Sequence, residues 1–145
     1  MSLNPINEVR YRYRLARQNL TRAERLYKLG DWAGTVQSAQ LAIENFTKTL
    51  IALFEIPTWS HDPSNQLLNL IDRFPTNIID EIRELADLAR EYAVEHSRST
   101  YGEPDKGLTP DELYGEGDAH RILIKAYRAQ NIVNEILKIL NISIS

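Results

Sequence analysis

The stretch "DWAGTVQSAQLAIENFTKTLIAL", residues 31–53, decides the fold. Its apolar residues recur at alternating steps of three and four, which is the spacing of one helical stripe. They are Val36, Ala39, Ile43, Phe46, Leu50 and Leu53. Asp31 stands at the expected N-cap, and Pro57 cannot continue the helical hydrogen-bond ladder. Further apolar residues lie away from this stripe, so the helix is apolar nearly all round and is predicted to be buried.

One narrow polar strip interrupts this helix, at Gln37, Gln40, Glu44 and Lys48. Glu44 and Lys48 have a favourable spacing, but an exposed pair of this kind contributes only about 0.3–0.5 kcal/mol. Burial of the pair can cost more than the pairing returns, so stability explains the strip poorly. Two interpretations stay open. The strip faces a cleft, a dimer partner or a ligand, or it is a solvated edge between packed neighbours.

The sequence before this helix contains another one. Asn4-Pro5 is typical of a helix start, because proline is favoured in the first turn. Apolar residues then recur at helical spacing from Val9 to Tyr27, and Gly30 ends the pattern.

The sequence after it predicts three more helical segments. Asp62-Pro63 begins a short leucine-rich helix that ends at Pro75, and a long helix then carries apolar residues from Ile78 to Tyr92. The polar loop "SRSTYGEPDKG", residues 97–107, follows that helix. Thr109, Pro110 and Glu112 form a capping-box pattern for a short turn, and the last helix carries apolar residues from Ile122 to Leu140.

No strand pattern competes with these helices, since the alternating "ISIS" at residues 142–145 is only four residues long. We therefore predict an all-α protein, an up-and-down bundle of four to five helices. The 145 residues fit a single domain, residues 1–145, with its core at about residues 5–140.

The composition excludes several kinds of functional site. The absence of cysteine excludes a disulfide framework, a thiol nucleophile and a cysteine zinc site. No apolar run approaches the ~20 residues of a membrane span, and the N-terminus lacks a signal-peptide core, so a cytoplasmic protein is expected. Charge is uneven: residues 1–48 hold 8 Lys/Arg and 4 Asp/Glu, and residues 49–145 hold 9 and 16. Such asymmetry serves a partner or lets one part of the molecule dock on another.

The order of several features resembles the HEPN domain (higher eukaryotes and prokaryotes nucleotide-binding). These features are Gln40, Ala42, Glu44 and Lys48 on the apolar helix, His61 before the leucine-rich helix, Tyr92 and Arg98 near the end of the long helix, and the alanine-rich "DAHRILIKAYRAQNIVNEIL" at residues 118–137. The resemblance covers about residues 5–140. It implies a four- or five-helix bundle, commonly a homodimer. Many such proteins are encoded beside a minimal nucleotidyltransferase as toxin–antitoxin-like pairs.

The catalytic branch of that family consists of metal-independent ribonucleases, marked by an arginine, four to six residues, and a histidine. Arg90 and His96 satisfy this spacing. The histidine would move the proton of the attacking 2′-hydroxyl, and the arginine would hold the phosphate. Six helical steps leave the two side chains about 120° apart, so they converge only if the helix breaks between them or a second subunit closes the site. Pairing of Arg90 with Asp87 and stacking of His96 on Tyr92 are the ordinary alternatives.

Arg98 sits where the family's non-catalytic branch carries its arginine, and no histidine follows it within range. We therefore expect an interaction or nucleotide-binding module without its own catalysis, dimeric and working with a nucleotidyltransferase-like partner. The expected working surface is Gln37, Gln40, Glu44, Lys48, Arg98 and Tyr101. Two alternatives remain. One is a metal-independent ribonuclease using His96 with Arg90 or Arg98, and the other is a structural subunit that self-assembles.

The other candidate groups carry less information. His61 is expected to fix its loop and His120 to lie on the surface, and the spacing of the histidines predicts no metal site. No cofactor is expected beyond a possible nucleotide ligand. Arg10, Arg14 and Arg17 form a basic stripe that would meet RNA phosphates or an acidic partner surface, including that of a twin subunit.

Overall fold

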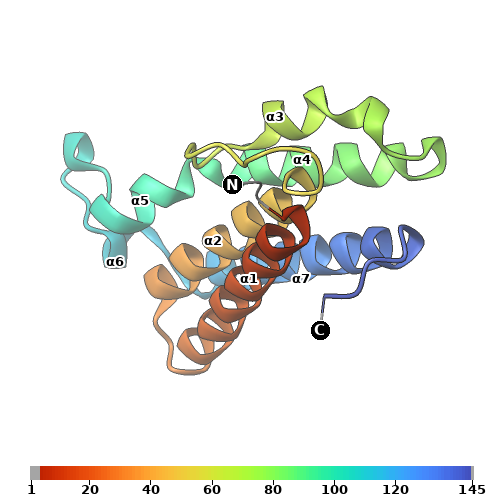
Figure 1. The fold of residues 1–145 in the computed structure, drawn as a ribbon. Coiled ribbons are helices and arrows are strands. Elements are labelled where there is room, and N and C mark those ends of the chain that lie inside the picture. The colour runs from red at the N-terminus through yellow and green to blue at the C-terminus, as the bar shows by residue number, and fades with distance from the viewer. Residues whose placement is uncertain (1–3, 145) are drawn as a thin grey trace.

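The computed structural model describes residues 4–144 (Figure 1). The helices are α1 (Pro5–Lys28), α2 (Trp32–Ile51), α3 (Ser64–Asn69), α4 (Ile79–Ala93), α5 (Glu95–Tyr101), α6 (Pro110–Leu113) and α7 (Glu116–Ile139). Short 3-10 turns occur at η1 (Ile71–Arg73), η2 (Thr76–Ile78) and η3 (Pro104–Lys106). Among the described residues, β pairing is confined to an isolated bridge between Glu103 and Leu108. The prediction of an all-α fold is confirmed.

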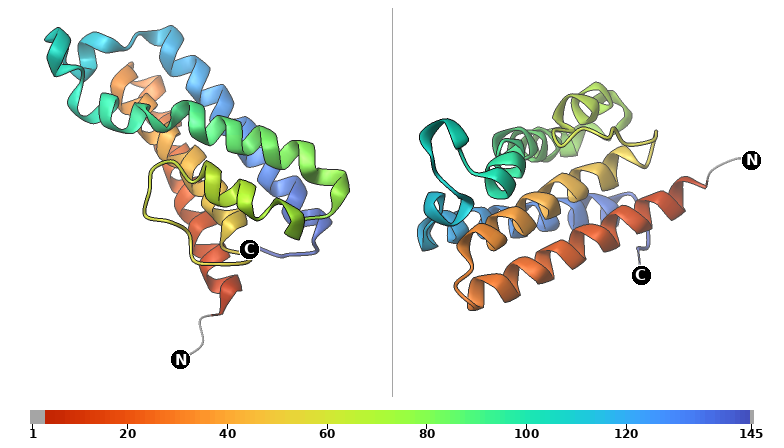
Figure 2. Two further views of the ribbon diagram at one scale, coloured as in Figure 1. Left: turned by 90° about the horizontal axis from the view of Figure 1, so that it is seen from above. Right: turned by 90° about the vertical axis from the view of Figure 1, so that its left-hand side faces the viewer.

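Helix α2 is the centre of the molecule and contacts every other α-helix. Helices α1 and α7 pack along it, and the views in Figure 2 place α3, α4 and α5 across its other side. Because neighbours surround α2, nearly all of its side chains are buried. The prediction of a buried second helix is confirmed, and its polar strip lies inside this packing.

The ends of the first two helices follow the expected capping chemistry. Asn4 Oδ1 accepts a hydrogen bond from the Ile6 backbone N–H at 3.1 Å, and Asp31 Oδ1 accepts one from the Gly34 N–H at 2.8 Å. Each bond satisfies a donor that the first helical turn leaves without a partner. Gly30 adopts φ +76° between the two helices. The chain reverses there, so α1 and α2 are antiparallel neighbours (Figure 1).

The long fourth helix of the prediction is in fact two helices. Helix α4 ends at Ala93, α5 begins at Glu95, and Val94 forms the break. Helix α5 packs against α2, as α4 does. The predicted leucine helix is likewise divided, into α3 and η1.

The core is formed by apolar side chains of α1, α2, α4 and α7. Phe46, Ile82, Leu85 and Ile136 are fully buried, and Phe46 meets the ring of Tyr13 edge-on with centroids 5.8 Å apart. Alanines on α1, α2 and α7 are also fully buried, which lets these helices approach closely. None of the helices between residues 4 and 144 is long and apolar enough to cross a membrane.

Candidate functional site

Three residues of the polar strip of α2, Gln40, Glu44 and Lys48, form a buried hydrogen-bonded network. Lys48 Nζ lies 3.0 Å from Glu44 Oε2, and the two side chains are 4% and 6% exposed. Gln40, one turn earlier, donates through Nε2 to Glu44 Oε1 at 3.2 Å. This part of the strip is therefore not a solvated edge, and its ion pair is withdrawn from water.

Two histidines from distant parts of the chain lie on this network. His61, in the loop between α2 and α3, has its Nδ1 2.9 Å from Glu44 Oε1. His96, on α5, has its Nδ1 3.3 Å from Gln40 Oε1. The two rings stack with centroids 3.5 Å apart and planes 18° from parallel.

The surrounding acceptors decide which nitrogen carries the proton in each ring. The Glu44 carboxylate pairs with the Lys48 ammonium and can only accept hydrogen bonds. Nδ1 of His61 is therefore the donor in its hydrogen bond with Glu44. Gln40 directs its amide N–H to Glu44, which leaves its oxygen to accept from Nδ1 of His96. Among the described residues, no hydrogen-bond partner contacts either Nε2. Both Nε2 atoms are therefore free to contact a ligand.

The loop that carries His61 is fixed to α3. Gln66 accepts the Thr58 N–H at 2.7 Å and donates to the Ile56 carbonyl at 2.9 Å. Asp62 accepts the Ser64 N–H at 3.0 Å, which orders the chain directly after His61. His61 does more than fix this loop, because its imidazole reaches α2 and α5.

His96 is held by the break between α4 and α5. Helix α5, which begins after that break, packs against α2, where Gln37 Nε2 donates to Thr100 Oγ1 at 3.2 Å. Burial lowers the pKa of His96 below its usual value, and His61 and Lys48 act in the same direction while Glu44 opposes them. The neutral imidazole is therefore favoured at this position.

Arg90 does not pair with Asp87. Its guanidinium donates to Ser64 Oγ at 3.3 Å and to Asn65 Oδ1 at 2.9 Å, at the start of α3. His96 stacks on His61 and not on Tyr92. Arg90 and His96 thus both contact the short segment 61–65, because the helix breaks between them.

Arg98 lies in a separate cluster. Its guanidinium contacts Glu95 Oε1 at 2.6 Å and Glu103 Oε1 at 2.8 Å, and it lies over the ring of Tyr114. Burial, followed by the hydrogen bond to Glu95, raises the pKa of Tyr114. Tyr101 is exposed. The structure brings Gln40, Glu44 and Lys48 together with His96. Gln37 instead bonds Thr100, and neither Arg98 nor Tyr101 joins the network.

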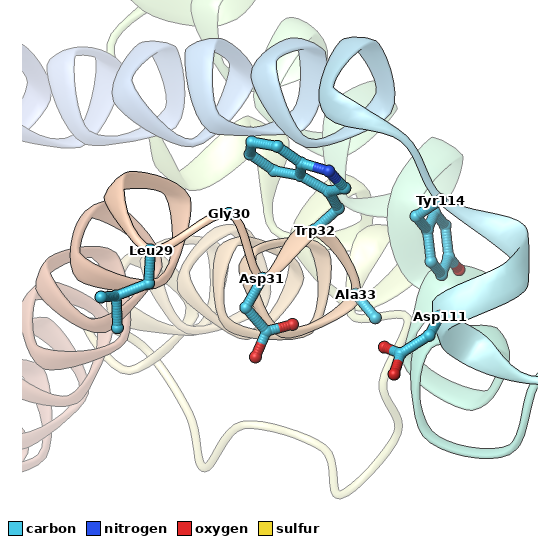
Figure 3. A pocket seen from close by; sticks show the side chains of 7 residues that line it. All are labelled: Leu29, Gly30, Asp31, Trp32, Ala33, Asp111 and Tyr114. Atoms are coloured by element: carbon cyan, nitrogen blue, oxygen red, sulfur yellow. The ribbon is translucent and has the colours of Figure 1, made fainter.

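Other hollows lie away from His61 and His96. A pocket of about 360 Å³ at the α1–α2 turn is lined by Leu29, Gly30, Asp31, Trp32, Ala33, Asp111 and Tyr114 (Figure 3). A groove along α1 is lined by Arg10, Tyr13, Arg14, Arg17, Gln18 and Ile144, so the predicted basic stripe shares one surface. His120 is exposed near the ring of Tyr27, as expected.

The pairing of His61 with His96 could not be found from the sequence. Both residues lie within the resemblance, but no local spacing connects them. Likewise, no feature of the sequence predicts that Trp59, two residues before His61, is 95% exposed.

Comparison with known proteins agrees with this architecture. The model of the HEPN domain matches residues 9–140. The crystal structure of TT1696 from Thermus thermophilus is similar in fold, with a TM-score of 0.67 and 24% identity, over 90% of this chain and 99% of that chain. Comparison with curated proteins gives no match. The helical architecture and the family match over nearly the whole chain lead to one conclusion: the chain belongs to the HEPN domain family.

Proposed function

We propose that this chain is a HEPN-type interaction and nucleotide-binding module whose ligand contacts the His61–His96 pair. One observation carries the proposal: two stacked imidazoles lie on a buried ion pair and keep both Nε2 atoms free. Desolvation of Glu44 and Lys48 costs free energy that apolar residues of similar size would not cost. A role in orienting the histidines explains why such a network occupies the central helix.

The pair suits a nucleotide in two ways. The His61 side chain is 50% exposed, so a nucleobase can stack on its outer face and extend the existing stack. The free Nε2 of each neutral ring accepts a hydrogen bond from a base amino group or a ribose hydroxyl. Arg90, anchored at Ser64 and Asn65, supplies a positive charge for a phosphate close to the same segment. Trp59, on the same loop, offers a second stacking surface.

The proposal includes a homodimer, a cytoplasmic setting, and a nucleotidyltransferase-like partner in a toxin–antitoxin-like system. The family resemblance supports the partner. Large exposed apolar side chains on the segments that carry the two histidines support an interaction surface, namely Ile56 and Trp59 before His61 and Val94 before His96. Analytical ultracentrifugation tests the dimer, and co-purification with a nucleotidyltransferase encoded beside this gene tests the partner. A monomeric chain, or a neighbourhood without such a gene, would remove that part of the proposal.

Ligand binding is tested by tryptophan fluorescence. The chain has two tryptophans, so Trp32→Phe leaves Trp59 as the reporter beside the site. Titration with AMP, ATP and short RNA is expected to quench Trp59 and to weaken at least tenfold in His61→Ala and His96→Ala. His120→Ala is the matched control, because its imidazole is exposed elsewhere. Equal affinities in all three histidine variants would contradict the proposed site.

A metal-independent ribonuclease is the second candidate. The observation in its favour is the break at Val94, which brings Arg90 and His96 to the same segment. Neutral His96 would take the proton of the 2′-hydroxyl, whose oxygen attacks phosphorus. The 5′-oxygen would leave with a proton from His61, giving a 2′,3′-cyclic phosphate and a 5′-hydroxyl.

RNA incubated with the pure protein and a chelator distinguishes cutting from binding. Cleavage that requires His96, and that does not occur after a nucleotide lacking its 2′-hydroxyl, would support the ribonuclease. Intact RNA that is nevertheless bound would support the module without catalysis.

A further inference from the structure

We infer that Glu44, His61 and His96 form a binding site for a divalent transition-metal ion such as Zn²⁺. Each residue offers one ligand atom, and these atoms all lie within 4.8 Å of one another. They come from three separate segments, namely α2, the loop before α3, and α5. Only the folded bundle brings them together, which is why the spacing of the histidines in the sequence indicated no metal site.

The donor set selects the class of ion. Two imidazole nitrogens and one carboxylate oxygen are a common protein ligand set of zinc sites that keep an open coordination position. Imidazole favours zinc, copper and nickel, whereas magnesium and calcium prefer oxygen ligands alone. The exposed half of the His61 side chain gives an ion a path from solvent. Water or a ligand oxygen completes the coordination on that side.

The residues around the Glu44 carboxylate already fix its orientation, as neighbouring residues do for the ligands of a metal site. Lys48 contacts Oε2 of Glu44 and leaves Oε1 facing the histidines. Gln40 contacts both Oε1 of Glu44 and Nδ1 of His96. Such outer hydrogen bonds fix the orientation of first ligands in metal sites, and their loss commonly costs about 10–100-fold in affinity.

Metal binding requires a small rearrangement of the rings. The nitrogen lone pairs lie in the ring planes, so two nearly parallel rings must open to converge on one ion at about 2.0–2.1 Å. His61 is the ring that moves, because it is on a loop and half exposed, while His96 is on a helix. The ion takes the place of the hydrogen between Nδ1 of His61 and Glu44, and the neutral imidazole then carries its hydrogen on Nε2, so its charge does not change.

The inference does not rest on nucleotide binding, because metal affinity is measured on the full chain without nucleotide. Calorimetric titration of the chelator-stripped protein with Zn²⁺ is expected to give one ion per chain. Affinity is expected to fall at least tenfold in His61→Ala and in His96→Ala and to stay unchanged in His120→Ala. Visible absorption of added Co²⁺ is expected to show a four- or five-coordinate site that disappears in the same two variants.

Glu44→Gln leaves Lys48 buried without its counter-ion, so that variant can lose binding through misfolding. The paired change Glu44→Gln with Lys48→Met removes the buried charge, and circular dichroism checks that it folds. Folded protein with weakened Zn²⁺ binding supports the site. No binding by the natural chain, or binding that the His61 and His96 changes leave intact, overturns the inference without affecting the nucleotide proposal.

Discussion

The imidazole rings of His61 and His96 stack with their centroids 3.5 Å apart. Nδ1 of each ring is hydrogen-bonded to a different residue of α2, Glu44 for His61 and Gln40 for His96. Gln40 bonds both His96 and Glu44, so the two histidines belong to one network. A substitution of Gln40 or Glu44 is therefore expected to disturb both rings. This coupling makes α2 the element that determines the geometry of the site.

Glu44→Gln is expected to lower the free energy of unfolding by about 3–5 kcal/mol, because it leaves the Lys48 ammonium buried and unpaired. Urea denaturation measures the change. Glu84→Gln is the matched control, since the Glu84–Arg128 pair is exposed and its loss is expected to cost about 0.2–1 kcal/mol. Equal effects of the two substitutions would show that burial of the Glu44–Lys48 pair carries no special cost.

Replacement of both Glu44 and Lys48 by leucine and methionine, respectively, tests why the pair is present. Apolar replacement of a buried ion pair is often neutral or stabilising by about 1–4 kcal/mol. We expect the double variant to unfold at the same or a higher urea concentration while losing ligand binding at the histidines. A strongly destabilised double variant would instead assign the pair a structural role.

Phe46→Ala is expected to destabilise the bundle by about 3–5 kcal/mol, because Phe46 is fully buried and meets the ring of Tyr13. Leu29→Ala provides the comparison: Leu29 is 80% exposed, and its loss is expected to change stability by less than about 0.5 kcal/mol. Thermal unfolding followed by circular dichroism measures both. A small effect at Phe46 would contradict the packing around α2.

Gly102→Ala is expected to destabilise the turn after α5 more than Gly107→Ala does. Gly102 has φ +73° and ψ −151°, a region that glycine alone occupies readily, and an added Cβ would lie 2.1 Å from the Leu108 carbonyl oxygen. Gly107 also has positive φ but has open space around it. We expect losses above about 2 kcal/mol at Gly102 and about 1 kcal/mol at Gly107, by urea denaturation. Equal losses would mean that the close backbone approach is unimportant.

Tyr127 is expected to ionise late in an alkaline titration. Burial first, and then its hydrogen bond to Glu24, raise its pKa from 10.0 to about 12. Because the folded-state pKa is the higher one, this contribution to stability is complete below pH 10 and is lost as the pH rises through about 12. The difference in tyrosinate absorbance between the natural chain and Tyr127→Phe measures this pKa. Glu24→Gln is expected to bring it closer to 10, and an unshifted tyrosine in the natural chain would exclude the contact.

Arg98→Ala and Arg90→Ala are expected to separate stability from ligand binding. Loss of Arg98 leaves the partly buried Glu95 and Glu103 without their shared cation, so stability falls while nucleotide affinity is kept. Loss of Arg90 removes the cation next to the His61 segment, so affinity falls more than stability. Calorimetry and unfolding on both variants measure the difference. Weaker nucleotide binding in Arg98→Ala alone would return Arg98 to the working surface.

The local features of this fold follow from the sequence. The α2 stripe from Val36 to Leu50 and the Asp31 cap depend on neighbours within a turn or two, so periodicity and capping chemistry predict them. The break at Val94 was not predictable, because it depends on the contact of α5 with α2, which are distant in sequence. The sequence also left open whether the polar strip faces solvent, since burial depends on the helices that surround it.

The sequence alone determined the helical class, the burial of α2 and the family resemblance, because helical periodicity and capping chemistry act over short separations along the chain. The tertiary structure decided that His61 and His96 meet above Glu44 and that Arg98 pairs with Glu95 and Glu103. Those contacts depend on how the loop after α2 and the break before α5 pack around one central helix. No spacing along the chain records that packing.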